Sequence, residues 1–259
     1  MDIFSSMGSL QGSAASWNLS AMLKTSGISM DVQRHLVQVY AALSACVLSA
    51  AIACGAVILL SPVPPYMSEW AGWLGMLSFV GATGGTIWLH MEPLHNFQRR
   101  VGILMMISAA MGISLSTLVA VTLEVDPSIL ITAFLMTTTV FLCFTGSALL
   151  ATRRSYLYLG GVLSSALSTM LVMNILNIFF RSTMLYAANL YLGLAVFCAY
   201  VIFDTQMIIE KASLGDKDSL KHALDLFLDF VSIFVRILII LLQNSGKKRS
   251  NSDSKRSKK

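Results

Sequence analysis

The chain has 259 residues, of which 56 % are hydrophobic and only 12 % are charged, with a formal net charge of +5 and a mean hydropathy of +0.72. Soluble globular domains usually carry about 25 % charged residues, so this composition excludes an ordinary soluble domain. The apolar residues form runs of about twenty, long enough to cross about 30 Å of hydrocarbon. We therefore predict a polytopic membrane protein, with membrane lipids around it and no nucleic-acid partner.

Seven apolar segments follow one another along the chain. They cover 36–60, 70–90, 101–123, 128–151, 156–179, 185–209 and 223–242. Lipid admits only helices or closed barrels, and these runs are too long and continuous for barrel strands of about ten alternating residues. We predict an all-α bundle of seven helices within 31–242, between a polar cytosolic segment, 1–30, and a basic disordered tail, 243–259. The first thirty residues lack a basic stretch followed by an apolar core, so we expect no cleavable signal peptide.

Basic residues alternate between successive loops, which indicates an orientation. The chain before the first apolar segment and the second, fourth and sixth loops contain basic residues: Lys24, Arg34, Arg99, Arg100, Arg153, Arg154, Lys211, Lys217 and Lys221. The first and third loops contain no Lys or Arg, and the fifth contains only Arg181. Because Lys and Arg accumulate on the cytosolic side, we expect the N terminus and the even-numbered loops to face the cytosol.

The last segment, 223–242, conflicts with this pattern. It contains Asp225, Asp229 and Arg236, and each charge near a helix centre costs roughly 2.5–3.5 kcal/mol on the insertion scale. A full crossing also puts the basic tail on the far side of the membrane. Two topologies stay open: the segment enters the membrane and returns, or it crosses against the charge bias. In both, the segment is less apolar than the six preceding spans, and the other helices must shield it from lipid.

Two carboxylates flank the sixth loop at matching distances. Asp204 lies twelve residues before Asp216, near the middle of that loop, and Asp229 lies thirteen residues after it. In an antiparallel helix pair both then lie at one depth, roughly 8–10 Å inside the helix ends. Ionisable groups inside a bundle are costly and usually functional, and two close carboxylates titrate as a unit. We predict a pH sensor.

When deprotonated, the pair of Asp204 and Asp229 also offers oxygen ligands to Ca²⁺. Ca²⁺ takes 6–8 oxygens, so the two carboxylates predict only a weak, transient ion on a permeation path, and no resident cofactor. A structural interpretation stays open beside this one. Asp229 could pair with Arg236, seven residues later, and Asp225, which shares its helix face, could cap the helix start.

Two long stretches carry a family resemblance. The stretch FDTQMIIEKASLGDKD…HALDLFLDFVSIFVRILIILL resembles the C-terminal signature of the Bax inhibitor-1 family, the transmembrane Bax-inhibitor-motif proteins. Residues 126–161, DPSILITAF…CFTGSALLATRRSYLYLGG, agree with that family, as do the start MDIFSS and the basic tail. In detail the resemblance is to the endoplasmic-reticulum branch, in its plant form.

The resemblance implies a seven-helix fold with a central last helix, a pH-sensitive calcium leak of the endoplasmic reticulum membrane, and suppression of programmed cell death. In bacterial relatives an aspartate pair senses pH, and by motif this pair falls on Asp204 (FDTQ) and Asp229 (LFLDF). The family also uses an arginine near the second helix as a latch on the sixth-helix aspartate. Arg99 and Arg100 are the nearest candidates, and they serve equally well as topology signals.

The tail contains seven basic residues: Lys247, Lys248, Arg249, Lys255, Arg256, Lys258 and Lys259. One interpretation is a solvated topology anchor. The other is binding to anionic lipid or an acidic partner, at about 1 kcal/mol per basic residue near the surface. The resemblance implies that such tails contact partners, including cell-death regulators and, in plants, calmodulin.

Three functions compete. The first is the calcium leak, and the second is an interaction protein that regulates cell-death and stress partners without significant conduction of its own. The third is an intramembrane aspartyl protease, a class that also pairs aspartates on neighbouring helices. Such proteases carry Gly-x-Gly-Asp, whereas Leu226, Phe227 and Leu228 precede Asp229. We therefore expect no enzymatic activity.

Overall fold

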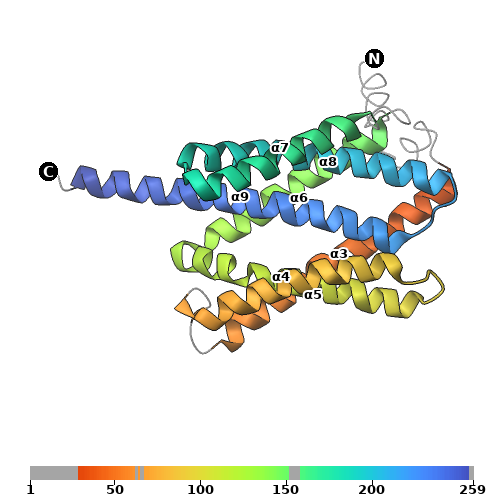
Figure 1. The fold of residues 1–259 in the computed structure, drawn as a ribbon, viewed down its shortest axis with the longest axis horizontal. Helices are drawn as coiled ribbons and strands as arrows, with labels where there is room; N and C mark the ends of the chain where they lie inside the picture. Colours follow the sequence, from red (N-terminus) through yellow and green to blue (C-terminus); the bar gives the residue numbers. More distant parts are fainter. Residues whose placement is uncertain (1–28, 62–63, 65–66, 152–157, 257–259) are drawn as a thin grey trace, which may run out of the picture.

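The computed structural model describes residues 29–61, 64, 67–151 and 158–256. Within these ranges the chain forms seven helices and no strand (Figure 1). The helices are α3 (Met30–Leu60), α4 (Glu69–Met91), α5 (Phe97–Val125), α6 (Pro127–Leu150), α7 (Leu159–Phe180), α8 (Thr183–Ser213) and α9 (Ser219–Arg256). Each coincides with one of the seven predicted segments, so the all-α prediction is confirmed.

Helix starts follow from local capping chemistry. The Ser29 hydroxyl accepts a hydrogen bond from the backbone N–H of Val32 at the start of α3. Asp126 accepts one from the N–H of Ser128 at the start of α6, where Pro127 occupies the first helical position. A side-chain acceptor at the N-cap satisfies one of the otherwise unpaired N–H groups of the first turn, and Pro fits the first position because no N–H is needed there. These caps begin α3 and α6 ahead of the apolar run in each case.

The last helix corrects two expectations. α9 continues unbroken to Arg256, where the sequence predicts a disordered tail from 243 onward. It also does not turn back, so the topology in which this segment enters and returns is wrong. Two features of the sequence explain why the helix continues. Residues 243–256 contain no proline and a single glycine, Gly246. Their basic side chains also interact favourably with the negative C-terminal end of the helix dipole. At about 1.5 Å per residue the helix is about 57 Å long.

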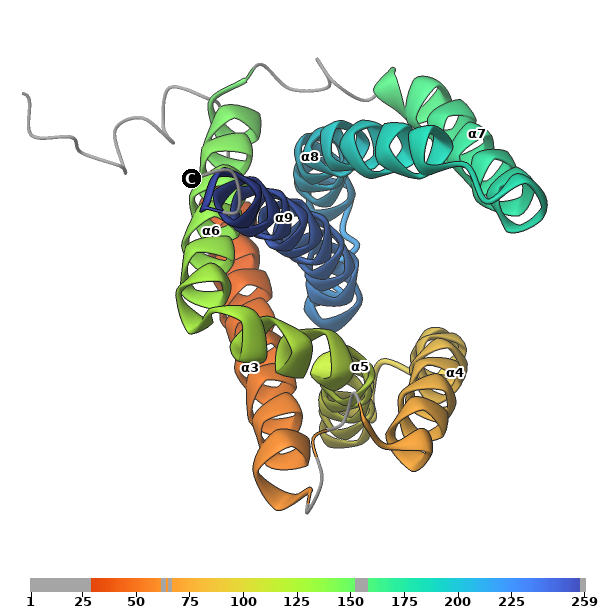
Figure 2. The same cartoon turned by 90° about the vertical axis from the view of Figure 1, so that its left-hand side faces the viewer.

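The same α9 is the central helix of the bundle. Figure 2 shows it between α3, α5, α6 and α8, and it packs against all four. α4 lies outside, against α5, and α7 lies outside, against α8. Helix α9 therefore buries its apolar residues on several faces, among them Leu224, Phe227, Ile233 and Leu238. The surrounding helices thus shield much of its surface.

Five helices in the described ranges are long and apolar enough to cross a membrane: α3, α5, α6, α7 and α8. α9 falls outside this group, as expected for the less apolar last helix. The sequence pattern also predicts α4 as one of six spans, but α4 is not among these five helices. It packs alongside α5. The described fold is a polytopic bundle in which one polar helix is enclosed by apolar ones.

Candidate functional site: the buried carboxylates and the α8–α9 turn

A tight turn makes α8 and α9 antiparallel. Residues 214–218 join the two helices, and Gly215 adopts a φ of +99°, which favours glycine. The turn sets Asp204 of α8 and Asp229 of α9 side by side. Their carboxyl groups lie close enough to interact with one another. Asp229 is buried, and its Oδ2 has no hydrogen-bond partner.

Asp225, one turn before Asp229, adds a third carboxylate whose charge reaches both members of the pair. Three like charges at such short range cannot all ionise cheaply in a partly dry environment. Lys211, near the end of α8, supplies positive charge close to Asp204 and Asp225. The sequence pattern does not predict Lys211 as a member of the site, because its helical position does not show which groups it faces.

No three of the described His, Cys, Asp and Glu side chains are arranged to hold a metal ion. The pair of Asp204 and Asp229 supplies at most four carboxylate oxygens, against the 6–8 that Ca²⁺ prefers. The chemistry of this set suits a shared proton and brief contacts with a passing cation.

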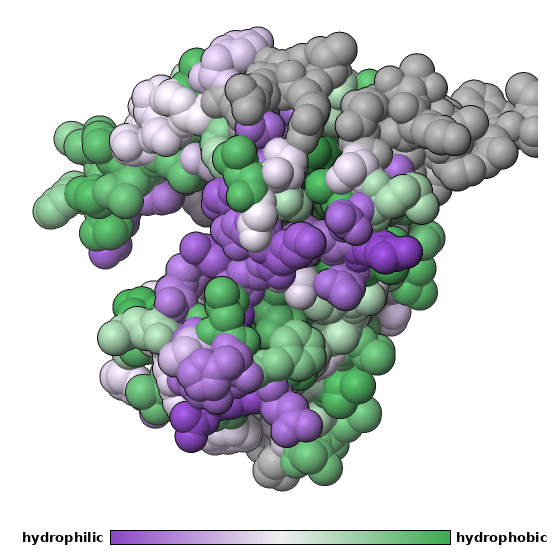
Figure 3. Space-filling view, turned by 90° about the vertical axis from the view of Figure 1, so that its right-hand side faces the viewer, coloured by the Kyte–Doolittle hydropathy of each residue, from purple (hydrophilic) through white to green (hydrophobic). Residues whose placement is uncertain are grey.

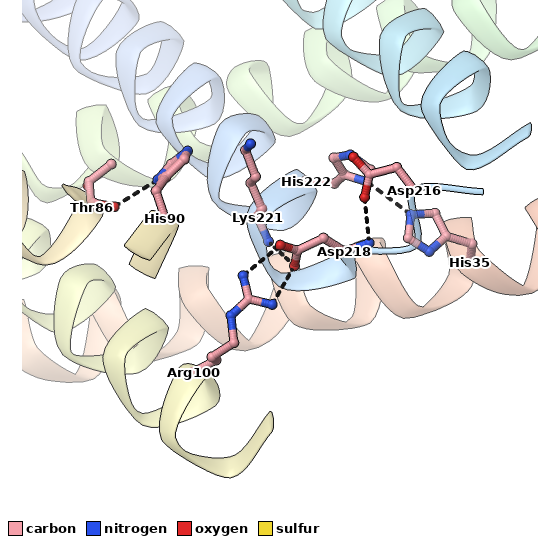
Figure 4. A network of polar contacts seen from close by, with 8 residues as sticks. All are labelled: His35, Thr86, His90, Arg100, Asp216, Asp218, Lys221 and His222. Carbon is pink, nitrogen blue, oxygen red and sulfur yellow. Dashed lines mark hydrogen bonds and ion pairs between the residues drawn. The ribbon is translucent and has the colours of Figure 1, made fainter. Parts of the chain in front are cut away.

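Arg100 forms a buried ion pair with the turn. Its Nη1 donates to Asp218 Oδ1 at 2.9 Å and its Nη2 donates to Asp218 Oδ2 at 2.6 Å (Figure 4). The Arg100 side chain is 4 % exposed. Such a bidentate contact fixes both the distance between the two side chains and their relative orientation. It ties the start of α5 to the start of α9.

Asp218 also accepts a hydrogen bond from the backbone N–H of Lys221 at 3.2 Å. Burial by itself would raise the pKa of Asp218, but the hydrogen bonds from Arg100 and from the Lys221 N–H outweigh it and hold the pKa below its usual value. Asp218 therefore keeps its charge throughout the physiological pH range, and the Arg100–Asp218 pair is not a proton switch there.

Arg99 behaves differently from its neighbour. It lies 3.4 Å from Glu92 Oε1 and its side chain is 66 % exposed, which is the geometry of a weak surface pair. The sequence analysis proposed Arg99 or Arg100 as a latch on Asp204. In the described residues Arg100 instead engages Asp218 in the turn, and Arg99 engages Glu92 at the end of α4.

Two histidines form a second link at this end. His35 Nε2 and His222 Nδ1 are 2.9 Å apart, and their rings meet edge to face (Figure 4). Both side chains are buried, and the outer nitrogens, His35 Nδ1 and His222 Nε2, have no hydrogen-bond partner. The pair joins α3 to α9. No sequence pattern predicts this pair, although each histidine lies within the first six residues of its helix at the same end of the bundle.

The polar end of the molecule is visible as a continuous band. Figure 3 shows hydrophilic residues running across the middle of the end where the α8–α9 turn lies. From this band, polar groups lead inward along α8 and α9 to Asp225, Asp204 and Asp229.

Arg236 lies deeper on α9, and its guanidinium stacks on the Phe197 ring with 4.4 Å between the guanidinium carbon and the ring centroid. Its Nη1 donates to the Ser232 carbonyl at 3.0 Å. A Cβ on Gly193 of α8 would collide with the guanidinium, so this glycine makes room for it. Arg236 is satisfied by an aromatic face and a carbonyl, and the structure does not give it the ion pair with Asp229 that the structural interpretation allowed.

The basic residues of the C-terminal segment divide in two. Lys247, Lys248, Arg249, Lys255 and Arg256 belong to the last turns of α9, of which the structure describes the backbone. Lys258 and Lys259 lie outside the described residues, as does Lys24 in the N-terminal segment. Their proposed contacts with lipid or protein partners stay predictions.

The fold and the site define a class: a polytopic helical membrane protein with interacting carboxyl groups on its central helix. A family model described as "Inhibitor of apoptosis-promoting Bax1" matches residues 32–246. The chain is 43 % identical to Bax inhibitor 1 of Arabidopsis thaliana over 249 residues, 96 % of both chains. It is 44 % identical to Bax inhibitor 1 of Bos taurus, covering 90 % of this chain and 95 % of the relative. Over its full length it is 42 % identical to Bax inhibitor 1 of Oryza sativa subsp. japonica, 99 % of which is covered. The chain belongs to the Bax inhibitor 1 family, as the sequence motifs predict.

Proposed function

We propose that this protein suppresses programmed cell death as a pH-sensitive calcium leak of the endoplasmic reticulum membrane, with its N terminus in the cytosol. The names of its relatives support the role in cell death. The observation that carries the leak is the contact between the carboxyl groups of Asp204 and Asp229 on two antiparallel helices. Burying two interacting carboxyl groups costs free energy, and a bundle that only had to be stable would not need them.

The proposed gate follows from the strength of hydrogen bonds to a charge. With one shared proton, Asp204 and Asp229 form an acid–carboxylate hydrogen bond, which is roughly twice as strong as a neutral one. This bond holds α8 against α9. Acidification adds a second proton, replaces the strong bond by a weak neutral contact, and loosens the seal. Calcium flux is therefore expected to rise as pH falls.

The two links at the α8–α9 turn complete this mechanism. Arg100–Asp218 anchors the start of α9 to α5, and His35–His222 anchors it to α3. With this end held, loosening at the aspartate pair moves the deeper part of α8 relative to α9 and leaves the turn in place. The turn therefore acts as a fixed pivot.

The test is Ca²⁺ flux into liposomes, measured against pH for the wild type, Asp204→Asn and Asp229→Asn. Each variant removes the shared proton and should flatten the pH response. Asp31→Asn, which removes an exposed carboxylate in the first turn of α3, is the matched control and should keep the wild-type profile. If both site variants also keep that profile, the proposed gate is wrong.

A second function is favoured by the length of α9. This helix runs past the other helices of the bundle (Figure 1) and carries five basic residues between 247 and 256. Such a basic helix suits acidic partners, including calmodulin-like ones that hold an amphipathic helix in a groove. An interaction protein of this kind should lose protection against cell death when 243–259 is deleted, with any calcium flux unchanged.

The same helix links the side that those partners occupy to the orientation of the α8–α9 turn. Because α9 is unbroken, its C-terminal end emerges opposite the α8–α9 turn (Figure 1). A cytosolic partner for the tail therefore requires the turn to face the lumen, against the distribution of Lys and Arg. Protease treatment of sealed microsomes, with epitopes in the turn and in the tail, distinguishes the two orientations.

A further inference from the structure

A large cavity lies at the end of the bundle opposite the Arg100–Asp218 pair. Its volume is about 590 Å³, and its walls come from α3, α5, α6 and α9. Every lining residue is apolar, glycine and cysteine included. On α3 the lining spans 47–59, on α5 112–123 and on α6 130–135. These are the ends of α3 and α5 remote from the turn, and the first turns of α6.

The cavity opens sideways between α3 and α6. Leu59 on one side is 85 % exposed and Leu135 on the other is 60 % exposed, while α3 and α6 are not among the helix pairs that pack closely. The floor belongs to α9, where Phe227 is fully buried and Phe230 nearly so. The opening therefore leads from the outer surface of the bundle to the central helix.

The surroundings identify the occupant. α3, α5 and α6 are membrane spans by length and composition, so hydrocarbon surrounds the opening. Water is disfavoured because this lining offers it no polar partner. An empty cavity is also disfavoured, because the atoms of its walls would lose dispersion contacts. One helical turn of 10 Å diameter and 5.4 Å rise takes about 400 Å³, so the cavity of about 590 Å³ holds less than two turns, too short a stretch to seat a helix of a second copy. We infer that the cavity binds one acyl chain of a membrane phospholipid.

The charges beside the cavity indicate the headgroup. The residues that join α5 to α6 at this end of the bundle, 124–127, contain Glu124 and Asp126 and no Lys or Arg. The basic residues 247–256 of α9 begin 13 residues, about 20 Å, beyond Phe234, the last residue of that helix in the lining. Glu124 and Asp126 lie within four residues of lining residues, so they repel an anionic headgroup and favour one with a positive amine, such as choline. The ligand is then a zwitterionic phospholipid of the leaflet opposite the α8–α9 turn. This inference rests on the membrane fold and is independent of the proposed leak.

A photoreactive lipid tests the site. The full-length protein is reconstituted in phosphatidylcholine vesicles that contain a trace of phosphatidylcholine with a diazirine at the end of one acyl chain. After illumination, mass spectrometry locates the adducts. We expect adducts on the α9 peptide that carries Phe227 and Phe230, which lipid at the outer surface does not reach. Adducts confined to exposed helix surfaces, or crosslinks between two protein chains in place of lipid adducts on α9, would overturn the inference.

Glycine variants give a matched comparison. Gly55 lines the cavity and a Cβ there meets nothing within 4 Å, so a side chain can leave the backbone here without a clash, and Gly55→Phe places a ring in the cavity space. Gly84 on α4 also has open space around it and lies outside the cavity, so Gly84→Phe is the control. Gly55→Phe should lose the α9 adducts and Gly84→Phe should keep them. Retention in Gly55→Phe, in protein with an unchanged melting temperature, would contradict the site.

A third arm tests the headgroup. Phosphatidylglycerol with the same labelled chain should give about tenfold fewer adducts on α9, which corresponds to about 1.4 kcal/mol. Equal labelling by the two lipids would contradict the choline preference.

Discussion

The two ends of the bundle bury α9 in different ways. At the α8–α9 turn, paired polar groups hold the helix: Arg100 to Asp218, and His35 to His222. Toward the other end, where α3 and α5 finish and α6 begins, apolar residues enclose a cavity whose floor includes Phe227 and Phe230 of α9. Polar pairs are directional and costly to break, whereas apolar walls tolerate exchange of their neighbours. The polar end is therefore expected to be rigid, and the apolar end to respond to its lipid.

The largest expected effect comes from breaking the buried ion pair at the polar end. Arg100→Ala leaves Asp218 without its partner in a partly buried place, and loss of one member of such a pair costs about 3–5 kcal/mol. Thermal unfolding of the purified protein in detergent measures it. Arg99→Ala removes an exposed partner of Glu92 and should cost at most about 1 kcal/mol. If the two variants melt together, Arg100–Asp218 is not the anchor described here.

The pH dependence of that loss has a definite sign. The pKa of folded Asp218 lies below its unfolded value, which is about 3.9 for Asp. The stabilisation is therefore fully present above about pH 4 and is lost as pH falls through the folded pKa. The difference between wild type and Arg100→Ala should stay constant from about pH 5 to 8. A difference that shrinks between pH 7 and 6 would point to another titrating group in the pair.

At the apolar end the helix packing itself can be tested. A Cβ on Gly112 of α5 would overlap the Ala50 backbone carbonyl of α3, so Gly112→Ala forces these two helices apart. Overpacking of this kind costs about 1–3 kcal/mol. Gly84→Ala, at a glycine with open space, should be neutral or stabilise by up to about 1 kcal/mol because alanine favours helix. The melting temperatures of Gly112→Ala and Gly84→Ala measure the difference. Equal values would mean that α3 and α5 can move apart at Gly112 without loss of stability.

The histidine pair should show a smaller effect. His35→Ala leaves His222 Nδ1 buried without a partner, which costs about 1–3 kcal/mol. Replacing both histidines removes the unpaired group, so the double variant His35→Ala with His222→Ala should lose less than the sum of the single variants. Unfolding of the four proteins in a double-mutant cycle measures the coupling. Strict additivity would show that the 2.9 Å contact stabilises neither helix.

Much of the site was accessible from local information. The antiparallel arrangement of Asp204 and Asp229 follows from counting residues across one loop, because each helical residue advances the chain by a constant distance. The seven helices follow from runs of apolar residues for a similar reason. Arg99 and Arg100 show where this method stops. They are adjacent in the sequence, yet one is buried on Asp218 and the other is exposed beside Glu92, because successive helical residues point about 100° apart.

The sequence by itself determined that this is a helical membrane protein, where its helices lie, its family, and that two carboxylates face each other across one loop. These properties depend on composition, on length and on spacing along one or two neighbouring helices. Only the tertiary structure decided the histidine pair, the partner of Arg100, the stacking of Arg236 on Phe197 and the apolar cavity. Each of these needs residues far apart in the chain to meet, as His35 and His222 do across 187 positions. Such meetings depend on how whole helices rotate and cross, which no local pattern in the chain encodes.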